Sequence, residues 1–371
     1  MSIKKLTQIP IRLIDLVTRG KITKNYLLEE IKYLDENGRE FLSLLERPKK
    51  SEQVFACEEA TEPQCKTAII LQGPLVQEEK FTLETIKIYN KIYPGCVIIV
   101  STWNDENATY IDQIKSETSC EIVLSTRPKH SGILNLNFQV ASTLAGLYCA
   151  KRMGIKYAFK TRTDFRFIKY GLIDFLYNLL QMYPISIDYQ KYRIVLGGDC
   201  LCSMFRAFWV ADKYNFGYID DMIQYWNYDM DNVSINRQKI ENELFQNERI
   251  SWRERTEKKL CAEPNIIRNY LSRFGEENDC SVKTYWNALE RQFIMMSETE
   301  SGAYWVKYFH KYTESSIRGI YYGDNRDNIN KLLSYNWDYV KWLNLLQGTL
   351  IYEDAYEKYQ IHNYHEKGKM F

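Results

Sequence analysis

The feature that most constrains this chain is an alternation of short apolar runs with amphipathic stretches between residues 67 and 124. The apolar runs have the length and β-branched content of buried strands, and they cover residues 67–71, 96–102 and 121–124. The stretches between them have helical spacing, and they cover residues 81–93 and 110–118. Strand, helix, strand, helix, strand at this spacing predicts right-handed crossovers and a parallel sheet flanked by helices.

A further helix and strand lead to the first candidate site residue. Residues 135–153 have helical spacing, and Gly154 stands where such a helix is expected to end. The apolar run 157–160 follows, and Asp164 comes after it between two arginines. Ligands of open parallel sheets lie outside the carboxyl ends of the strands, so Asp164 is predicted to face a ligand. An Asp that caps a turn beside surface arginines would leave the same pattern.

The rest of the chain predicts more of the α/β pattern and helices at both ends. Helical spacing recurs at residues 171–183, 262–274, 328–346 and 353–359, and strand-like patterns at 193–196, 202–210 and 292–296. The predicted organisation is a helical segment over residues 1–50, an α/β domain over 66–310 and a helical extension over 311–371. The N-terminal segment reads as two helices broken around Gly20. Its first helix is basic and amphipathic, which suits either an anionic membrane surface or the flank of the domain.

The composition argues against several classes of protein. The chain has 371 residues with 49 Lys and Arg against 48 Asp and Glu, and its net charge of +1 gives no reason to expect nucleic acid binding. The four histidines lack metal-ligand spacing on a helix, which argues against a zinc hydrolase. Neither Gly-x-Gly-x-x-Gly nor a Walker loop is present, which argues against dinucleotide and ATP binding.

The sequence also bears on the compartment. The nine cysteines are scattered and form no Cys-x-x-Cys pair, as expected in a reducing cytosol. No apolar run approaches the roughly 18 to 20 residues that span a bilayer. The first residues lack the apolar core and cleavage site of a signal peptide. We therefore expect a cytoplasmic protein, with peripheral membrane contact left open.

Polar or turn residues follow three of the predicted strands. Gln72 and Gly73 follow the first strand, Trp103 the second, and Asp164 the fourth. These ends converge in a doubly wound sheet. A nucleobase and ribose can lie over the first two, because Gly73 allows close approach of the backbone, while Trp103 or Asp105 can stack on a base or accept from it. A plain Gly-Pro turn explains Gly73 equally well.

Asn135, Asn137 and Gln139 open the helix that precedes the Asp164 strand. Helix N-termini favour anions, and an Asn side chain there either caps the helix or contacts a ligand. Capping explains one Asn easily. Three polar residues at alternate positions are harder to explain in that way, so a role in a donor pocket stands beside the structural one.

Four motifs together resemble the WavE lipopolysaccharide-synthesis family over roughly residues 66–310. They are Gln72-Gly73-Pro74, Ser101-Thr102-Trp103, the run Asn135-x-Asn137-x-Gln139-x-x-Ser142-Thr143-x-x-Gly146, and Lys160-Thr161-Arg162-Thr163-Asp164, with Gly217 to Met222 after them. The resemblance implies a GT-A-like, Rossmann-type fold. It also implies a glycosyltransferase that uses a nucleotide sugar to build lipopolysaccharide core or capsule on a glycan or glycolipid acceptor, and peripheral contact with the inner membrane is left open.

The sequence departs from the Asp-x-Asp signature usual in such folds, whose two carboxylates hold a divalent cation against the donor diphosphate. Arg162 stands in the first of these positions, and Arg166 follows Asp164. Either Asp164 binds Mn or Mg with ligands from elsewhere, or the arginines neutralise the leaving diphosphate directly. A CMP-sugar donor, which leaves as a monophosphate, also fits the missing carboxylate.

An inverting transferase needs a base for the acceptor hydroxyl. Asp212 lies beyond a predicted β segment and Glu263 at the start of a helix, while Asp220 and Asp221 are further candidates. Structural roles compete with this chemistry. A first-turn Glu263 is favoured by the helix dipole, and Asp220 with Asp221 suits a helix cap.

These observations predict a glycosyltransferase in which Asp164 and either Glu263 or Asp212 are catalytic. One alternative is a non-catalytic protein that binds nucleotide sugar or glycan. Another is a sugar-phosphate or nucleotidyl transferase on the same sheet. Nucleotidyl transferases normally offer a Gly-rich loop and a lysine after the first strand, and Gln72-Gly73-Pro74-Leu75 offers neither clearly.

Overall fold

The computed structural model describes residues 21–38, 46–56, 65–198, 203–236, 251–306 and 336–361. The chain separates into two compact units, Met1–Pro48 and Lys49–Phe371. In the first unit, helix α2 (Lys21–Asn37) buries none of its residues. The helix predicted before Gly20 lies outside the described residues.

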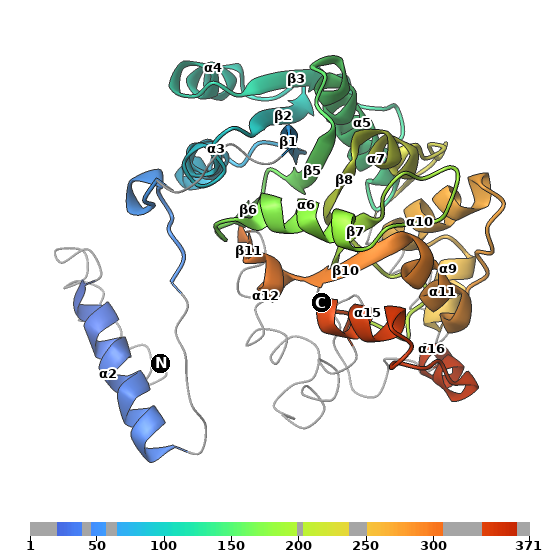
Figure 1. Cartoon of the computed structure of the whole chain (residues 1–371). Helices are drawn as coiled ribbons and strands as arrows, with labels where there is room; N and C mark the ends of the chain where they lie inside the picture. Colours follow the sequence, from blue (N-terminus) through green and yellow to red (C-terminus); the bar gives the residue numbers. More distant parts are fainter. Residues whose placement is uncertain are drawn as a thin grey trace, which may run out of the picture. The chain divides into compact units, whose positions relative to one another are not determined.

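The second unit is built on a seven-stranded sheet of order β10-β7-β8-β5-β1-β2-β3 (Figure 1). The strands are β1 (Thr67–Gln72), β2 (Val97–Trp103), β3 (Glu121–Ser125), β5 (Tyr157–Arg162), β7 (Ile194–Gly198), β8 (Ala211–Tyr218) and β10 (Phe293–Ser297). Neighbouring strands are parallel, except that β8 runs antiparallel to both β5 and β7. The predicted α/β fold with a mostly parallel sheet is confirmed.

Helices cover both faces of this sheet (Figure 1). One face carries α5 (Leu136–Arg152), which packs on β1, β2 and β3, and α7 (Ile219–Trp226), which packs on β5 and β8. Helix α10 (Ala262–Arg273) packs on α7. The other face carries α3 (Phe81–Ile92) and α6 (Leu172–Met182), and α15 (Tyr339–Leu346) lies beside α6, where the hydroxyls of Tyr183 and Tyr339 are 2.6 Å apart.

Smaller elements complete the described part of the second unit. Two short strand pairs join β4 (Gly132–Ile133) to β9 (Ser234–Ile235) and β6 (Phe165–Phe167) to β11 (Ala303–Trp305). The further helices are α4 (Ala108–Glu117), α9 (Trp252–Glu257), α11 (Val282–Gln292), α12 (Glu298–Ser301) and α16 (Lys358–Ile361). Single 3₁₀ turns lie at Ser51–Gln53, Glu78–Lys80 and Asp354–Glu357.

One predicted strand is wrong. Residues 203–210 form turns, and the sheet instead uses β8, which begins at Ala211. The sequence of β8 includes Asp212, Lys213 and Asn215, although all of its residues but the last are buried. Because these polar residues interrupt the apolar run, the sequence of β8 lacks the pattern of a buried strand. At the C-terminal end, the helix predicted over 353–359 is a 3₁₀ turn followed by α16.

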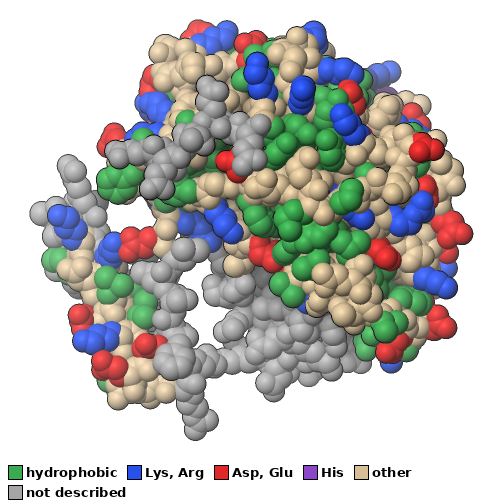
Figure 2. Space-filling view, in the orientation of Figure 1, with side chains coloured by type: hydrophobic (Ala, Val, Ile, Leu, Met, Phe, Trp, Pro, Cys, Tyr) green, Lys and Arg blue, Asp and Glu red, His purple; other side chains and the backbone are tan. Residues whose placement is uncertain are grey.

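Two features of the described residues concern contact with a membrane. Among the described residues, no helix combines the length and apolar character needed to cross a bilayer. Helix α6 leaves Phe175 and Met182 exposed, and Figure 2 shows hydrophobic side chains gathered at the surface on this side of the second unit. Cytoplasmic location and peripheral contact with the inner membrane stay predictions.

Candidate functional site

The candidate site is the edge of the sheet at which β1, β2, β3 and β5 end, which we call the carboxyl edge. The antiparallel strand β8 begins at this edge because it runs the other way. Gln72, Trp103 and Arg162 are the last residues of β1, β2 and β5, and Asp212 is the second residue of β8. All four are predicted site residues. They therefore share one edge of the sheet, as expected for a ligand site of an open sheet.

Asp164 and Arg162 form an ion pair directly beyond β5. The Nε atom of Arg162 lies 2.8 Å from Oδ1 of Asp164, and a second guanidinium nitrogen lies 3.0 Å from Oδ2. This is the bidentate geometry that planar guanidinium and carboxylate groups favour. Asp164 is 8% exposed, and the ring of Trp305 on β11 lies 5.4 Å from the centre of the Arg162 guanidinium.

Asp212 reaches the edge through a bulge in β8. Ala211 pairs with Gly197 and Asn215 with Leu196, so the residues between Ala211 and Asn215 stand opposite a single step of β7. Bulges of this kind re-aim side chains and are common beside active sites. The Asp212 side chain is 9% exposed and makes no hydrogen bond or ion pair with the described residues. A carboxylate in this setting is available to a ligand.

The other two bulge residues anchor the bulge to the end of β10. The hydroxyl of Tyr214 donates to the carbonyls of Met296 and Ser297, at 2.7 and 3.0 Å. Lys213 pairs with Glu298, with 3.0 Å between Nζ and Oε1. These contacts leave no signal in the sequence, because they join residues that lie far apart along the chain.

Lys160 lies on β5 beneath the bulge and is fully buried. Its Nζ atom donates to the backbone carbonyl of Asp212 and lies 4.3 Å from the centre of the Trp226 ring on α7. Burial lowers the pKa of Lys160 from 10.5 to about 7, while the nearby Asp212 carboxylate acts in the opposite direction. Lys160 stood in the sequence motif but had no predicted role of its own.

The loop after β1 is tied both to α5 and to the Asp164 segment. The amide of Gln72 donates to the hydroxyl of Ser142 at 2.9 Å. Gly73 has a φ angle of 115°, a conformation that other residues adopt only with strain. The hydroxyl of Thr163 donates to the carbonyl of Pro74. This loop therefore keeps a fixed position beside the residues that end β5.

Trp103 is 1% exposed and does not itself face an open surface. Arg127 covers it, with the guanidinium centre 4.8 Å from the Trp103 ring and 5.7 Å from the Phe138 ring. The Nε atom of Arg127 lies 2.8 and 3.1 Å from the two oxygens of Asp105, and this bond lowers the pKa of the Asp105 carboxyl. The exposed part of this region is thus the Arg127–Asp105 pair, and Arg127 was not predicted.

The three polar residues around the start of α5 have different surroundings. Asn137 is 1% exposed, and its amide donates to the carbonyls of His130 and Asp231 and accepts from the Asp231 amide. These three hydrogen bonds join the loops of His130 and Asp231 and occupy the side-chain amide of Asn137. Asn135 is exposed, has a left-handed backbone and makes no capping bond. Gln139 is half-buried, and its Oε1 has no hydrogen-bond partner among the described residues.

Arg166 points away from the carboxyl edge and packs against α3. It is 2% exposed and donates to the hydroxyl of Thr85 and to the carbonyls of Lys49 and Phe81. Burial lowers the pKa of its guanidinium. Donors directed at the protein backbone are not available to a phosphate, so we leave Arg166 out of the proposed site.

The carboxylates considered as bases fall at two different edges. Asp221 accepts from the backbone amides of Lys191 and Tyr192, which precede β7, and Asp220 pairs with Lys151 on α5. Both lie at the start of α7, opposite the carboxyl edge, and are therefore not bases for this site.

Glu263 is in the first turn of α10 and is half-buried. The far end of α10 is fixed near the start of β7, because Tyr270 donates to Gln190 at 2.8 Å. The end with Glu263 therefore extends toward the carboxyl edge. Asp212 and Glu263 both remain candidates for the acceptor side.

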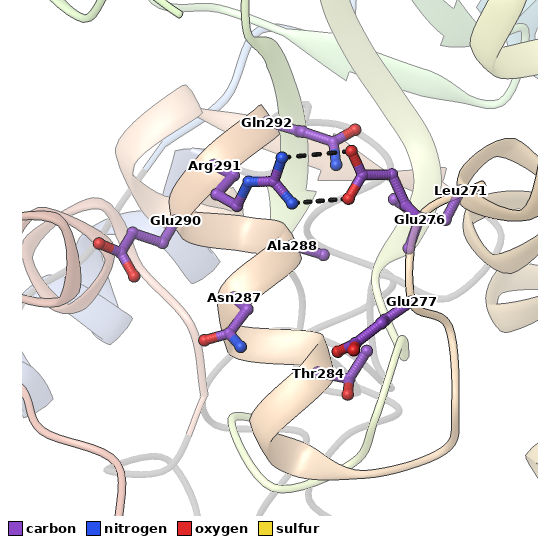
Figure 3. Close-up of a pocket in the computed structure, with 9 residues that line it drawn as sticks. All are labelled: Leu271, Glu276, Glu277, Thr284, Asn287, Ala288, Glu290, Arg291 and Gln292. Carbon is purple, nitrogen blue, oxygen red and sulfur yellow. Dashed lines mark hydrogen bonds and ion pairs between the residues drawn. The ribbon is translucent and has the colours of Figure 1, made fainter. Parts of the chain in front are cut away.

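A pocket in the second unit lies at the opposite edge of the sheet (Figure 3). Its lining comes from the end of α10, the loop after it and α11, which leads into the start of β10. Arg291 and Glu276 face each other across it, with nitrogen-to-oxygen distances of 2.6 and 3.2 Å. None of the predicted site residues lines this pocket.

The residues beyond β5 suit an anion better than a divalent cation. No group of three or more His, Cys, Asp or Glu side chains arranged for a metal ion occurs in the described part of the chain. Both oxygens of Asp164 are engaged by Arg162, whose own charge repels a cation. Of the alternatives left open by the sequence, neutralisation of a leaving phosphate by Arg162 uses the ion pair as it stands, whereas binding of Mn or Mg by Asp164 requires that its bonds to Arg162 open.

The comparison with solved structures found matches of low similarity. A cytidylyltransferase from Leptospira borgpetersenii serovar Hardjo-bovis (strain JB197) has 11% identity and a TM-score of 0.32, and the match covers 78% of this chain and 100% of that one. The core-mannan synthase A of Aspergillus fumigatus in its Mn/GDP form has 10% identity and a TM-score of 0.28, with coverages of 72% and 82%. At such TM-scores these likenesses carry no argument about the site.

The family comparison is decisive where the individual structures are not. No match was found among curated proteins. The profile described as WavE lipopolysaccharide synthesis matches residues 67–366, which is most of the chain and includes the whole carboxyl edge. This confirms the resemblance carried by the Asn135 run and the Asp164 motif, and the chain belongs to the WavE lipopolysaccharide synthesis family.

Proposed function

We propose that this protein is a glycosyltransferase that moves a sugar from a nucleotide-activated donor to a lipopolysaccharide core or capsular glycan. Family membership supports a role in lipopolysaccharide synthesis. The observation that carries the reaction type is the pairing of Asp164 with Arg162 at the end of β5. On the neighbouring strand β8, the Asp212 carboxylate makes no hydrogen bond or ion pair with the described residues. A cation for a leaving phosphate and a carboxylate for an acceptor hydroxyl are the groups that an inverting glycosyl transfer can use.

In the proposed reaction, the acceptor hydroxyl attacks the anomeric carbon of the donor sugar. A new C–O bond forms, and the bond between the anomeric carbon and the phosphate oxygen breaks. Asp212 takes the proton of the hydroxyl as general base. The guanidinium of Arg162 stabilises the negative charge that develops on the leaving phosphate, and Asp164 orients that guanidinium through its two hydrogen bonds.

The nucleotide is proposed to lie over the ends of β1 and β2. Gly73 and Gln72 border this region with backbone and amide groups, and the Arg127–Asp105 pair offers both donors and an acceptor above Trp103. A guanidinium can also stack on a base. Exposed Asn135 and half-buried Gln139 lie at the start of α5 and can contribute to the donor pocket.

The test is donor binding followed by turnover. Purified protein is heated with UDP-, GDP-, CMP- and dTDP-sugars, each with and without Mn²⁺ or Mg²⁺, and the melting temperature is recorded. A donor at about a hundred times its dissociation constant adds about 2.7 kcal/mol of stability. We expect one nucleotide class to stabilise the protein and to be consumed, and Asp164→Asn to lose that turnover while remaining folded.

Glu276→Gln, which changes a carboxylate at the opposite edge, is the matched control and is expected to keep both binding and turnover. If none of the four nucleotide classes stabilises the protein, the donor assignment is wrong. Binding without any consumption of donor in the presence of lipopolysaccharide acceptor would instead support a non-catalytic assembly protein.

A further inference from the structure

We propose that Lys160 is a positioning residue that holds the start of β8 from beneath and so fixes the Asp212 carboxylate at the carboxyl edge. The inference rests on the proposed function, because it assigns Lys160 a task only if Asp212 acts on the acceptor. It adds a residue that touches neither donor nor acceptor.

The first support is the contact itself. Lys160 is fully buried, and its Nζ atom donates to the backbone carbonyl of Asp212, the same residue whose side chain is proposed as base. The face of the Trp226 ring lies 4.3 Å from Nζ on the side of α7. A cation over an indole ring is held by the ring's electrons, so Lys160 is restrained from both sides.

The second support is that the bulge removes the usual partners of this carbonyl. Strand β8 pairs with β5 only between Asn215 and Tyr218, and Ala211 is the next residue of β8 that pairs with β7. The backbone of Asp212 therefore lies between two ladders. A buried carbonyl without a partner costs about 1–3 kcal/mol, and the lysine supplies the missing donor.

The third support is the polar character of the layer below the bulge. Asn215 is the direct cross-strand partner of Lys160 and is fully buried, yet neither atom of its amide has a hydrogen-bond partner among the described residues. Sheets that only need stability bury apolar side chains in such positions, because an unpaired polar group is costly. A loss of stability from a buried polar side chain is expected beside a functional site, where the position of the side chains matters more than stability.

The charged groups around Lys160 show what kind of support it gives. Asp212 on β8 and Asp164 at the end of β5 face it with negative charge and Arg162 with positive charge, while α7 contributes only the Trp226 ring. An amine donates a hydrogen bond whether or not it is protonated. Lys160 can thus hold the Asp212 carbonyl on both sides of neutral pH.

The experiment compares three variants by steady-state kinetics with donor and acceptor. Lys160→Met keeps the length of the side chain and removes the donor. Lys160→Gln keeps an amide donor without the charge. Arg193→Met is the matched control, because Arg193 is also buried, donates to the carbonyls of Tyr183 and Glu290, and lies 5.8 Å from the Trp342 ring, but at the other edge of the sheet.

We expect Lys160→Met to lower kcat about tenfold to a hundredfold, the effect of a small displacement of a catalytic group, with the KM for donor within about twofold of wild type. Lys160→Gln should retain more of kcat than Lys160→Met. Arg193→Met should lower the melting temperature without lowering kcat per folded molecule.

Two outcomes would overturn the inference: an unchanged kcat in Lys160→Met, or a fall no larger than that in Arg193→Met at equal folded fraction. Should Lys160→Met fail to fold, the comparison of Lys160→Gln with Arg193→Met decides in the same way. A wild-type protein that consumes no nucleotide sugar would refute the proposed function and this inference with it. Turnover in wild type together with unaffected Lys160 variants would refute the inference alone.

Discussion

At the scale of single residues, Arg162 and Arg166 flank Asp164 in the sequence but differ in their surroundings. Arg162 pairs with Asp164 at the carboxyl edge, whereas Arg166 is buried against α3. In one extended strand the two arginines would share a face, but a turn at Thr163 and Asp164 separates β5 from β6 and breaks the alternation. The sequence could predict two guanidinium groups near Asp164, and it could not predict which one the turn would bury.

This difference predicts opposite effects of the same substitution at the two positions. Arg162→Gln should lower kcat about a hundredfold to a thousandfold with little change in melting temperature, because a group that stabilises the leaving charge is lost. Arg166→Gln should lower the melting temperature and leave the kinetics of the folded fraction unchanged. Kinetics and thermal unfolding of both variants check this. The reverse pattern would move the phosphate site to the α3 side.

The choice between the two candidate bases is also a question of single residues. Asp212→Asn should lower kcat about a hundredfold to ten-thousandfold and preserve donor binding, because it removes a general base but not the nucleotide contacts. Glu263→Gln is expected to change kcat less than about threefold. The measurement is turnover with saturating donor and acceptor. If Glu263→Gln lowers kcat more than Asp212→Asn does, Glu263 and not Asp212 is the general base.

The burial of Lys160 predicts a pH dependence of stability. Its pKa falls from 10.5 to about 7 on folding, so between these pH values the unfolded chain binds more protons than the folded one. Stability therefore rises with pH across this range. We expect the difference in unfolding free energy between wild type and Lys160→Met to shift in favour of wild type from pH 7 to pH 10, as measured by urea denaturation. A difference that stays constant with pH would mean that Lys160 remains charged when buried.

At the scale of elements, the bulge in β8 determines where three side chains point. Tyr214 packs over Gly197, where any added Cβ would lie 2.5 Å from the tyrosine ring. The alternation of apolar runs was enough to predict β1, β2 and β5 nearly to the residue, because buried parallel strands are largely apolar. It also predicted β3, although β3 is an edge strand whose residues are exposed or half-buried. It failed for β8, since Asp212, Lys213 and Asn215 are kept in a buried strand for reasons that the local sequence does not show.

Gly197→Ala should destabilise the protein by about 1–3 kcal/mol, because the methyl group overpacks against the Tyr214 ring. Denaturant unfolding of the variant measures the loss. The control is the double variant Gly197→Ala with Tyr214→Ala, in which the clash is absent. Its loss should be smaller than the sum of the two single losses, and simple additivity would show that the ring moves aside at no cost.

At the scale of the whole molecule, residues 356–360, near the end of the part that the structure describes, contact the loop that leads into β8. Gln360 on α16 accepts from the amide of Ala207 at 3.2 Å and donates to the carbonyl of Cys280 at 3.0 Å. The rings of Tyr356 and Tyr359 lie 5.0 and 4.8 Å from the Phe205 ring. The sequence predicted helical structure at this end, but contacts between aromatic residues so distant along the chain leave no local signal.

Removal of residues 351–371 should therefore lower the free energy of unfolding by about 3 kcal/mol or more, because it uncovers Phe205 and removes two aromatic partners. The measurement is urea denaturation of the shortened chain against the full chain. Gln360→Ala alone should account for only about 1–2 kcal/mol. A shortened chain as stable as the full one would show that these contacts are not part of the folded core.

The bulge of β8 also limits which insertions and deletions this part of the chain can accept. The three side chains of the bulge have different surroundings. Asp212 lies at the carboxyl edge, Lys213 pairs with Glu298, and Tyr214 packs over Gly197. Loss of one residue in this stretch would leave two residues between the paired positions Ala211 and Asn215, so the remaining side chains of the bulge would point in new directions. A substitution at Lys213 changes one contact of the bulge, whereas a deletion of one residue would displace the Asp212 carboxylate together with its neighbours.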